Sequence, residues 1–315
     1  MKHLPIVLAC LACTPAIAQD YPTRPIRLIV PTAPGGSFDM ISRLLAEEAG
    51  KSLGQTIVVE NRPGANGNVG MDSVAKSDKD GYMLGNCAIG VCSVNSLFYK
   101  MPFDFERELT PVFWTTSLTN MLVVKNDGKI RTLDDFIALA KSRELNYGSS
   151  GLGSAHHMSS ELLSKELGIK FQHVAYRGAA PALTAVIAGE IDFMIENVSS
   201  VVGYLKSGQL TGLGVTSLRR SAMAPTIPTF AEQGYRGVIV EPWFGFVAAA
   251  GTPPEIVTKL NEAFNQALQS QKVRDRFRDM DLTPEGGSPE RFGAHIRAEQ
   301  AKWKSTVSAA GITVK

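Results

Sequence analysis

The chain has 315 residues, of which 44% are hydrophobic and 20% are charged, and its formal net charge is +2. This length suits two ordinary domains with well-packed cores, and the composition excludes a disordered, collagen-like or disulfide-dense protein. The 32 basic and 30 acidic residues are spread along the chain, without the blocks that are typical of nucleic-acid or membrane surfaces. We therefore expect a small molecule as the partner and no nucleic acid.

The N-terminal segment predicts export. A short polar start precedes an apolar run over residues 4–13, and Ala16 and Ala18 stand at the two positions that a signal peptidase reads. The run is too short to span a bilayer, which needs roughly 20 apolar residues. We predict that residues 1–18 are a cleaved signal peptide and that the mature chain is periplasmic. A core helix and a lipoprotein cysteine are the alternatives for this segment.

Cys87 and Cys92 are the two cysteines that follow the export segment. An oxidising compartment permits a disulfide between them, and two buried free thiols are an equal alternative. With no cluster of Cys or His nearby, the sequence predicts no zinc site.

Strands and helices alternate in the first part of the mature chain. Apolar runs predict the strands, a helical period follows Ser37, and Gly54 ends that helix. Together these elements predict a βαβαβ half-sheet. The predicted strands cover residues 26–30, 56–60 and 82–86, and the predicted helices cover residues 37–53 and 70–76.

A second alternating series begins at residue 121. No flexible linker separates the two series, so we predict two α/β lobes that pack together. Two long helices near the C-terminus have no strand partners of their own and are expected to cover the first lobe. The second series predicts strands at 121–124, 146–147, 171–175, 191–195 and 210–215, with helices at 132–141, 155–167, 181–188 and 201–206.

Familiar enzyme motifs are incomplete in this sequence. The P-loop pattern fails at Leu45, the dinucleotide fingerprint fails at His156, and the nucleophile elbow fails at Leu152. We therefore predict no enzyme, no cofactor and no metal site. A secreted hydrolase with His157 as its base is the alternative from another functional class.

Three predicted strand-to-helix loops combine glycine or small residues with a helix start, at residues 34–37, 151–154 and 177–179. The first amides of a helix lack backbone partners and lie at the positive end of its dipole. A glycine there lets a ligand approach the backbone, and such loops lie at the carboxyl ends of strands, where open α/β sheets bind ligands. Several of these loops around one cleft would form a carboxylate receptor.

Each of these features also has a structural interpretation. Any single glycine loop is commonly only a turn, and Asp39 can complement the dipole of its own helix. His157 can cap or pack within its first turn, Tyr176 can pack at a strand end, and the Asn197 amide can hold a loop. The recurrence of one loop pattern in both halves of an exported chain favours the ligand-binding interpretation.

The order of motifs along the chain resembles the Bug-type periplasmic receptors of tripartite tricarboxylate transporters. The resemblance covers essentially the whole mature chain. The matching segments are 21–31, 34–39, 59–64, 80–82, 148–154 with His157, 176–178 with 181–183, 189–192, 228–232, and Trp243 with 251–253.

This resemblance implies a two-lobed, clamshell periplasmic binding protein of the type II-like class, with each lobe a mixed sheet flanked by helices. The first lobe would comprise residues 19–121 and 243–315 and the second residues 122–242, with hinge strands near 119–125 and 238–248. Such a protein captures a small di-, tri- or aromatic carboxylate and delivers it to membrane permease subunits without chemistry. We expect a monomer. A ligand-responsive partner of a membrane sensor is a further alternative.

The resemblance also implies a set of ligand contacts. Thr32, Ala33, Glu196 and the Cys87–Cys92 segment depart from the family's usual residues near this pocket, so the identity of the carboxylate stays open. Arg177 is expected to face solvent. The expected ligand-binding residues are Ala33, Gly35, Gly36, Ser37, Phe38, Asp39, Ile89, Gly153, Ser154, His157, Tyr176, Gly178, Ala179 and Asn197.

Overall fold

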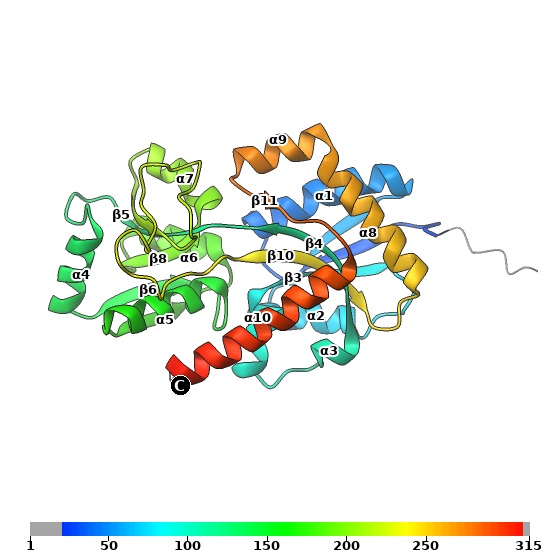
Figure 1. Cartoon of the computed structure of the whole chain (residues 1–315), viewed down its shortest axis with the longest axis horizontal. Helices are drawn as coiled ribbons and strands as arrows, with labels where there is room; N and C mark the ends of the chain where they lie inside the picture. Colours follow the sequence, from blue (N-terminus) through cyan, green and yellow to red (C-terminus); the bar gives the residue numbers. More distant parts are fainter. Residues whose placement is uncertain (1–20, 311–315) are drawn as a thin grey trace, which may run out of the picture.

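The computed structural model describes residues 21–310 and arranges them around two sheets with helices on their faces (Figure 1). This confirms the predicted α/β class with two mixed sheets. The predicted signal peptide and its cleavage site lie outside the described residues. None of the described helices has both the length and the apolar character that crossing a bilayer requires.

The first sheet has six strands in the order β11-β4-β10-β3-β1-β2. Its parallel part is the predicted βαβαβ unit, in which β1 pairs with both β2 and β3, and β10 then joins it antiparallel to β3 and β4. The elements of this part are β1 (Ile26–Val30), α1 (Ser37–Leu53), β2 (Ile57–Asn61), α2 (Asn68–Ala75), β3 (Met83–Ala88), α3 (Phe105–Glu108), β4 (Leu109–Ser117), β10 (Trp243–Ala249) and β11 (Thr283–Pro284).

The long strand β4 is not among the elements that the sequence predicts. Pro111 lies inside it and has no amide hydrogen to give to a sheet ladder, which argues against a strand. The structure accommodates this proline where the register between β4 and β10 shifts, at the pair of Pro111 with Val247. The bulge therefore removes the need for an amide at that position.

The second sheet has five strands in the order β7-β6-β8-β5-β9. The strands β6, β7 and β8 run parallel, whereas β5 pairs antiparallel with β8 and β9. Its elements are β5 (Asn120–Lys125), α4 (Leu133–Ser142), β6 (Leu145–Ser149), α5 (Ala155–Leu167), β7 (Phe171–Ala175), α6 (Ala179–Ala188), β8 (Phe193–Asn197), α7 (Val198–Lys206) and β9 (Leu210–Val215).

The C-terminal helices return to the first sheet, as predicted. Helix α8 (Pro254–Gln269) packs against α1 and β4, followed by α9 (Gln271–Asp279), and α10 (Pro289–Ala310) packs against β4. In Figure 1, α10 runs from the first sheet toward α5, and Trp303 shares a buried apolar cluster with Met158 of α5. The last helix therefore contacts elements of both halves of the molecule.

The chain passes between the two sheets after β4 and again just before β10. The amide of Leu118 donates a hydrogen bond to the carbonyl oxygen of Pro242 over 2.7 Å, so these two crossing segments lie side by side. The segments around Thr216 and Val240 also lie side by side, because the Val240 amide donates a hydrogen bond to the Thr216 carbonyl oxygen. These hydrogen bonds hold together the segments that cross between the two sheets.

Candidate functional site

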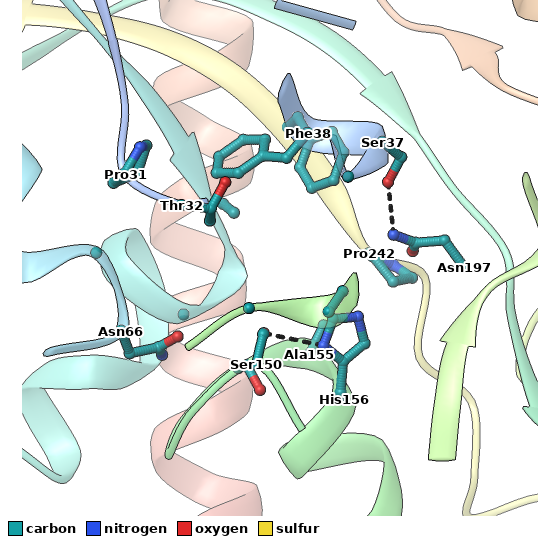
Figure 2. A pocket seen from close by; sticks show the side chains of 18 of the residues that line it. Pro31, Thr32, Ser37, Phe38, Asn66, Ser150, Ala155, His156, Asn197 and Pro242 are labelled. Atoms are coloured by element: carbon teal, nitrogen blue, oxygen red, sulfur yellow. Dashed lines mark hydrogen bonds between the residues drawn. The ribbon is translucent and has the colours of Figure 1, made fainter. Parts of the chain in front are cut away.

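A cleft of about 830 Å³ lies where the loops of the first sheet face the loops of the second (Figure 2). Most of the residues that line it are apolar or glycine. The polar side chains in the lining are short hydroxyl and amide groups and one imidazole. No Asp, Glu, Lys or Arg within residues 21–310 lines it. The polar lining residues are Thr32, Ser37, Asn66, Ser150, Ser154, His156 and Asn197.

Four helices begin at this cleft, and the residue before each of them lines it. These residues are Gly36 before α1, Ser154 before α5, Gly178 before α6 and Asn197 before α7. Ser154 caps α5 by accepting a hydrogen bond from the His157 amide over 3.3 Å, whereas the other three provide no side-chain cap. Uncapped amides at the positive ends of α1, α6 and α7 favour a bound anion.

Helix α7 begins earlier than the sequence predicts, and this brings a fourth helix start to the cleft. The predicted helix covered 201–206, but the observed helix starts at Val198 directly after β8. Asn197 therefore stands between a strand and a helix. Its Nδ2 donates to Ser37 Oγ over 2.8 Å, and both side chains are buried.

Loops from the two sheets also approach each other closely beside this pair. A Cβ on Gly178, which has φ of +142°, would lie 3.5 Å from the Ala33 side chain, so a larger residue would narrow the cleft. The Tyr99 hydroxyl donates to the Leu152 carbonyl over 3.1 Å. Phe38 and Phe244 form an aromatic wall, with their ring centroids 4.4 Å apart. The cleft thus has loops of both sheets around it and an apolar aromatic side.

Most of the residues that the family resemblance marks as ligand contacts line this cleft. Five of the marked residues do not line it: Gly35, Asp39, Gly153, His157 and Tyr176. Those that line it are Ala33, Gly36, Ser37, Phe38, Ile89, Ser154, Gly178, Ala179 and Asn197.

Asp39 is buried behind the first glycine loop and binds that loop instead of facing the cleft. Its carboxylate accepts hydrogen bonds from the Gly35 amide (3.1 Å) and the Asn61 amide group (2.9 Å), and it forms an ion pair with Arg43 (2.9 Å). Burial alone would raise the pKa of Asp39, but the hydrogen bonds from Arg43, Asn61 and Gly35 outweigh burial and lower it. Asp39 therefore holds the shape of the 33–37 loop.

His157 lies in the interior beneath the second glycine loop. Its Nδ1 accepts the Gly153 amide hydrogen over 3.2 Å, and its ring packs against His173 at 4.5 Å between centroids. Burial, with the neighbouring His173, lowers the pKa of His157 to about 3. A base that is buried, neutral and outside the cleft lacks access to a substrate, so the arrangement gives no support to the hydrolase hypothesis.

Tyr176 packs at the end of β7, and Arg177 beside it is exposed and outside the cleft. Burial, with Glu190 as a smaller contribution, raises the pKa of Tyr176. The ring of Tyr176 would lie 3.6 Å from a Cβ on Gly148, so it covers the strand β6.

Several lining residues were not named as ligand contacts by the sequence. Ser150 directly precedes the second glycine loop, His156 is adjacent to the predicted His157, and Asn66 lies in the 61–67 turn. The sequence signal that could have indicated these residues as ligand contacts is their position next to the predicted loops. Which of two adjacent side chains faces the cleft depends on the rotation of α5 about its axis, which the sequence pattern does not fix.

Cys87 and Cys92 form a disulfide, which settles the choice that the sequence left open. Both are buried, and the four residues between them, 88–91, all line the cleft. The bond therefore closes the loop that forms one wall of the site. Elsewhere in residues 21–310, no group of three or more His, Cys, Asp or Glu is placed to hold a metal ion.

Comparisons with known proteins agree with this architecture. The family model described as tripartite tricarboxylate transporter family receptor matches residues 41–312. BugT of Bordetella pertussis is 36% identical over 305 residues, covering 96% of this chain and 94% of BugT.

Two solved structures are similar along nearly their whole length. R. palustris Rpa4515 with adipate has a TM-score of 0.90 and 35% identity, covering 93% of this chain and 99% of that one. MatC (Rpa3494) from Rhodopseudomonas palustris with bound malate has a TM-score of 0.87 and 31% identity, covering 91% and 100%. The chain therefore belongs to the tripartite tricarboxylate transporter receptor family, a family of receptors and not of enzymes, as the sequence predicted.

Proposed function

We propose that this protein is a periplasmic receptor that captures a small carboxylate in the cleft and delivers it to a tripartite tricarboxylate-type permease. The proposal includes export by a cleaved signal peptide, action as a monomer, and two lobes with the boundaries and hinge strands that the family resemblance implies. Adipate and malate are the ligands named for the two similar structures, and this supports a di- or tricarboxylate. An aromatic carboxylate also fits the Phe38–Phe244 wall.

The observation that carries the proposal is the set of four helix starts around a cleft without acidic side chains. Each hydrogen bond between an amide and a charged oxygen contributes about 1.5–3 kcal/mol. Three or four such bonds give micromolar affinity after the cost of association is subtracted. An anion held in this way needs no arginine or lysine, in keeping with the observed lining.

Closure of the two lobes would make the bound state recognisable to the permease. A ligand that touches both sheets shifts an open–closed equilibrium by its differential affinity for the closed form. The Ser37–Asn197 hydrogen bond and the Tyr99–Leu152 hydrogen bond are contacts that opening would break.

The test is calorimetric titration and thermal unfolding of the purified protein with mono-, di-, tri- and aromatic carboxylates, each beside its uncharged amide. We expect at least one carboxylate to bind with a micromolar Kd and to raise the unfolding temperature, while its amide does neither. The variant Ala33→Asp places a negative charge in the cleft and should abolish binding. Its matched control, Ala138→Asp on the exposed face of α4, should leave binding intact. No response to any carboxylate at millimolar concentration would refute the proposal.

A further inference from the structure

Glu299 of α10 accepts hydrogen bonds from two tryptophan side chains. Its Oε2 lies 3.3 Å from Trp243 Nε1 and 2.9 Å from Trp303 Nε1, and its Oε1 forms an ion pair with Lys302 Nζ over 3.0 Å. Glu299 and both tryptophans are buried. An indole nitrogen can only donate, and a buried donor that loses its acceptor is costly. The position of the Glu299 carboxylate therefore determines where both indoles lie.

The two tryptophans differ in their relation to the ligand cleft. Trp243 lines the cleft, and so do its chain neighbours Pro242 and Phe244. Trp303 is fully buried and does not line it, and neither does any other residue of α10 that the structure describes. Glu299 therefore stands behind the wall of the cleft and holds one residue of that wall together with one residue of the interior.

The wall formed by residues 242–244 lies where the first sheet is irregular. Trp243 begins β10 directly after residues 238–242, which form neither helix nor strand, and the register between β10 and β4 shifts directly after Phe244. Helix α10 packs closely against β10 at this point, because a Cβ on Gly245 would overlap the Phe292 ring. The Trp243–Glu299 hydrogen bond thus connects an irregular strand start to the long helix behind it.

The next residue of α10 holds a second segment of the same wall. Gln300 Nε2 donates a hydrogen bond to the Cys92 carbonyl oxygen over 2.9 Å, at the end of the disulfide loop whose residues 88–91 line the cleft. Ala88 is also the register partner of Phe244 in the pairing of β3 with β10. Two adjacent residues of one helix are therefore bonded to the two neighbouring segments that form this side of the cleft.

We propose that Glu299 is a positioning residue for ligand selection, which fixes the wall of residues 242–244 through Trp243 and so lets the protein discriminate carboxylates by the size of their hydrocarbon part. This inference rests on the proposed function. The wall carries the Phe244 ring, which stands 4.4 Å from the Phe38 ring between centroids. A wall held in one place fits a narrow range of hydrocarbon shapes, whereas a wall that can shift binds each ligand less tightly and distinguishes them less.

The first test is calorimetric titration of Glu299→Leu, which has a similar shape and no acceptor. The probes are succinate, glutarate, adipate, pimelate, citrate, benzoate and phenylacetate. The Kd of the ligand that binds the wild type best should rise about two- to tenfold, which corresponds to the net contribution of one hydrogen bond. Its advantage over the other probes should shrink. Glu299→Gln keeps an acceptor oxygen and should restore both the affinity and the preference. A folded Glu299→Leu with the wild-type preference, or a Glu299→Gln as impaired as Glu299→Leu, would overturn the proposal.

The second test compares the two donors of Glu299. Trp243→Phe removes the donor that lines the cleft and should reproduce the weaker binding and weaker preference of Glu299→Leu. Trp303→Phe is the matched control, because it removes a donor to the same oxygen but leaves the Trp243–Glu299 bond in place. It should lower the resistance to urea and leave the ligand preference unchanged. A purely structural role of Glu299 predicts equal effects of both variants on binding, and that result would overturn the proposal. This pair also decides the question if Glu299→Leu does not fold.

The third test asks whether Glu299 acts through Trp243. Glu299→Leu should add little to the change in Kd that Trp243→Phe already causes, because coupled residues are not additive. Fully additive changes would show that Glu299 affects binding by another route. If no probe binds the wild type, the proposed function itself fails. If the wild type binds the probes without distinguishing them, or Trp243→Phe binds them as the wild type does, only the inference about Glu299 fails.

Discussion

The Asn197 side-chain amide donates a hydrogen bond to Ser37 Oγ over 2.8 Å and so joins the start of α7 to the start of α1. Asn197 is the last residue of β8 in the second sheet, whereas Ser37 begins α1 after β1 of the first sheet, and both are buried at the wall of the cleft. This bond therefore joins elements of the two sheets directly, in addition to any contact with ligand.

Ser37→Ala should favour the open form. The lost hydrogen bond is worth about 0.5–1.5 kcal/mol, so we expect the Kd for the best carboxylate to rise about two- to tenfold. Small-angle scattering of the unliganded protein should show a larger radius of gyration, while the unfolding temperature stays close to that of the wild type.

Ser52→Ala is the matched control for this change. It removes a hydroxyl from the other end of α1, where Ser52 donates to the Ala49 carbonyl over 3.0 Å. It should alter neither affinity nor scattering. An unchanged radius of gyration in Ser37→Ala would show that this bond does not hold the two halves together.

Asp39→Asn should destabilise the protein at neutral pH. The pKa of Asp39 is lowered in the folded state, because hydrogen bonds to its carboxylate outweigh the effect of burial. Its contribution is therefore present above the unfolded pKa of about 3.9 and is lost as the pH falls through the lower folded value. We expect a loss of about 1–2 kcal/mol at pH 7 by urea unfolding, which shrinks toward zero in acid.

The control for Asp39 is Asp72→Asn, which breaks an i,i+4 pair between the partly exposed Asp72 of α2 and the exposed Lys76 directly after it. Such pairs contribute about 0.3–0.5 kcal/mol, so its effect should be small. If Asp39→Asn and Asp72→Asn cost the same, Asp39 does not hold the 33–37 loop in the way described.

Breaking the Cys87–Cys92 disulfide should weaken ligand binding as well as stability. The bond spans a sequence separation of five, and closing so short a loop contributes about 2 kcal/mol to folding through the unfolded chain. Because residues 88–91 line the cleft, reduction should also raise the Kd several-fold. The measurement is titration and urea unfolding with and without dithiothreitol.

The double variant Cys87→Ala/Cys92→Ala separates reduction from other effects of the reductant. It should behave like the reduced wild type and should not respond to dithiothreitol. A wild type whose affinity is the same in both redox states would show that the disulfide does not shape this wall.

Local sequence patterns predicted most of the strands and helices. The main element that they did not predict is strand β4, which depends on pairing with a strand distant in the sequence. The alternation of strands and helices on either side of residue 121 predicted the parallel part of the first sheet and all five strands of the second. Strand β4 was not predicted. Pro111 disfavours a strand locally, and the partner strand β10 follows more than a hundred residues later in the chain. The bulge that accommodates the proline exists only once those two strands have met.

The site was predictable as a set of loops but not as a set of side chains. Helix α5 begins where the sequence placed it, yet successive residues of a helix point about 100° apart. His156 therefore faces the cleft and Glu196, while His157 faces Tyr147 and His173 in the interior. Only the packing of α5 on the sheet decides between the two histidines.

The buried His157 and the half-buried His173 should make the protein sensitive to mild acid. Burial lowers the pKa of His157 to about 3 and that of His173 to about 4, both below the ordinary value of 6.5. The unfolded chain therefore binds these protons first as the pH falls. The stability that the neutral rings contribute is complete above pH 6.5 and is lost progressively as the pH falls from about 6.5 to about 4 for His173 and to about 3 for His157.

The double variant His157→Asn/His173→Gln tests this assignment. Asparagine can accept the Gly153 amide hydrogen in place of Nδ1, and glutamine can reach Ser149, whose hydroxyl lies 2.6 Å from His173 Nε2. Urea unfolding at pH 7.5 and pH 5 should show that the wild type loses stability on acidification and that the variant loses less. Burial also lowers the pKa of His295. This residue is present in both proteins, so its contribution to the acid response is the same in the two. An equal loss in the two proteins would mean that the protons are taken up elsewhere and that this histidine pair does not govern the acid response.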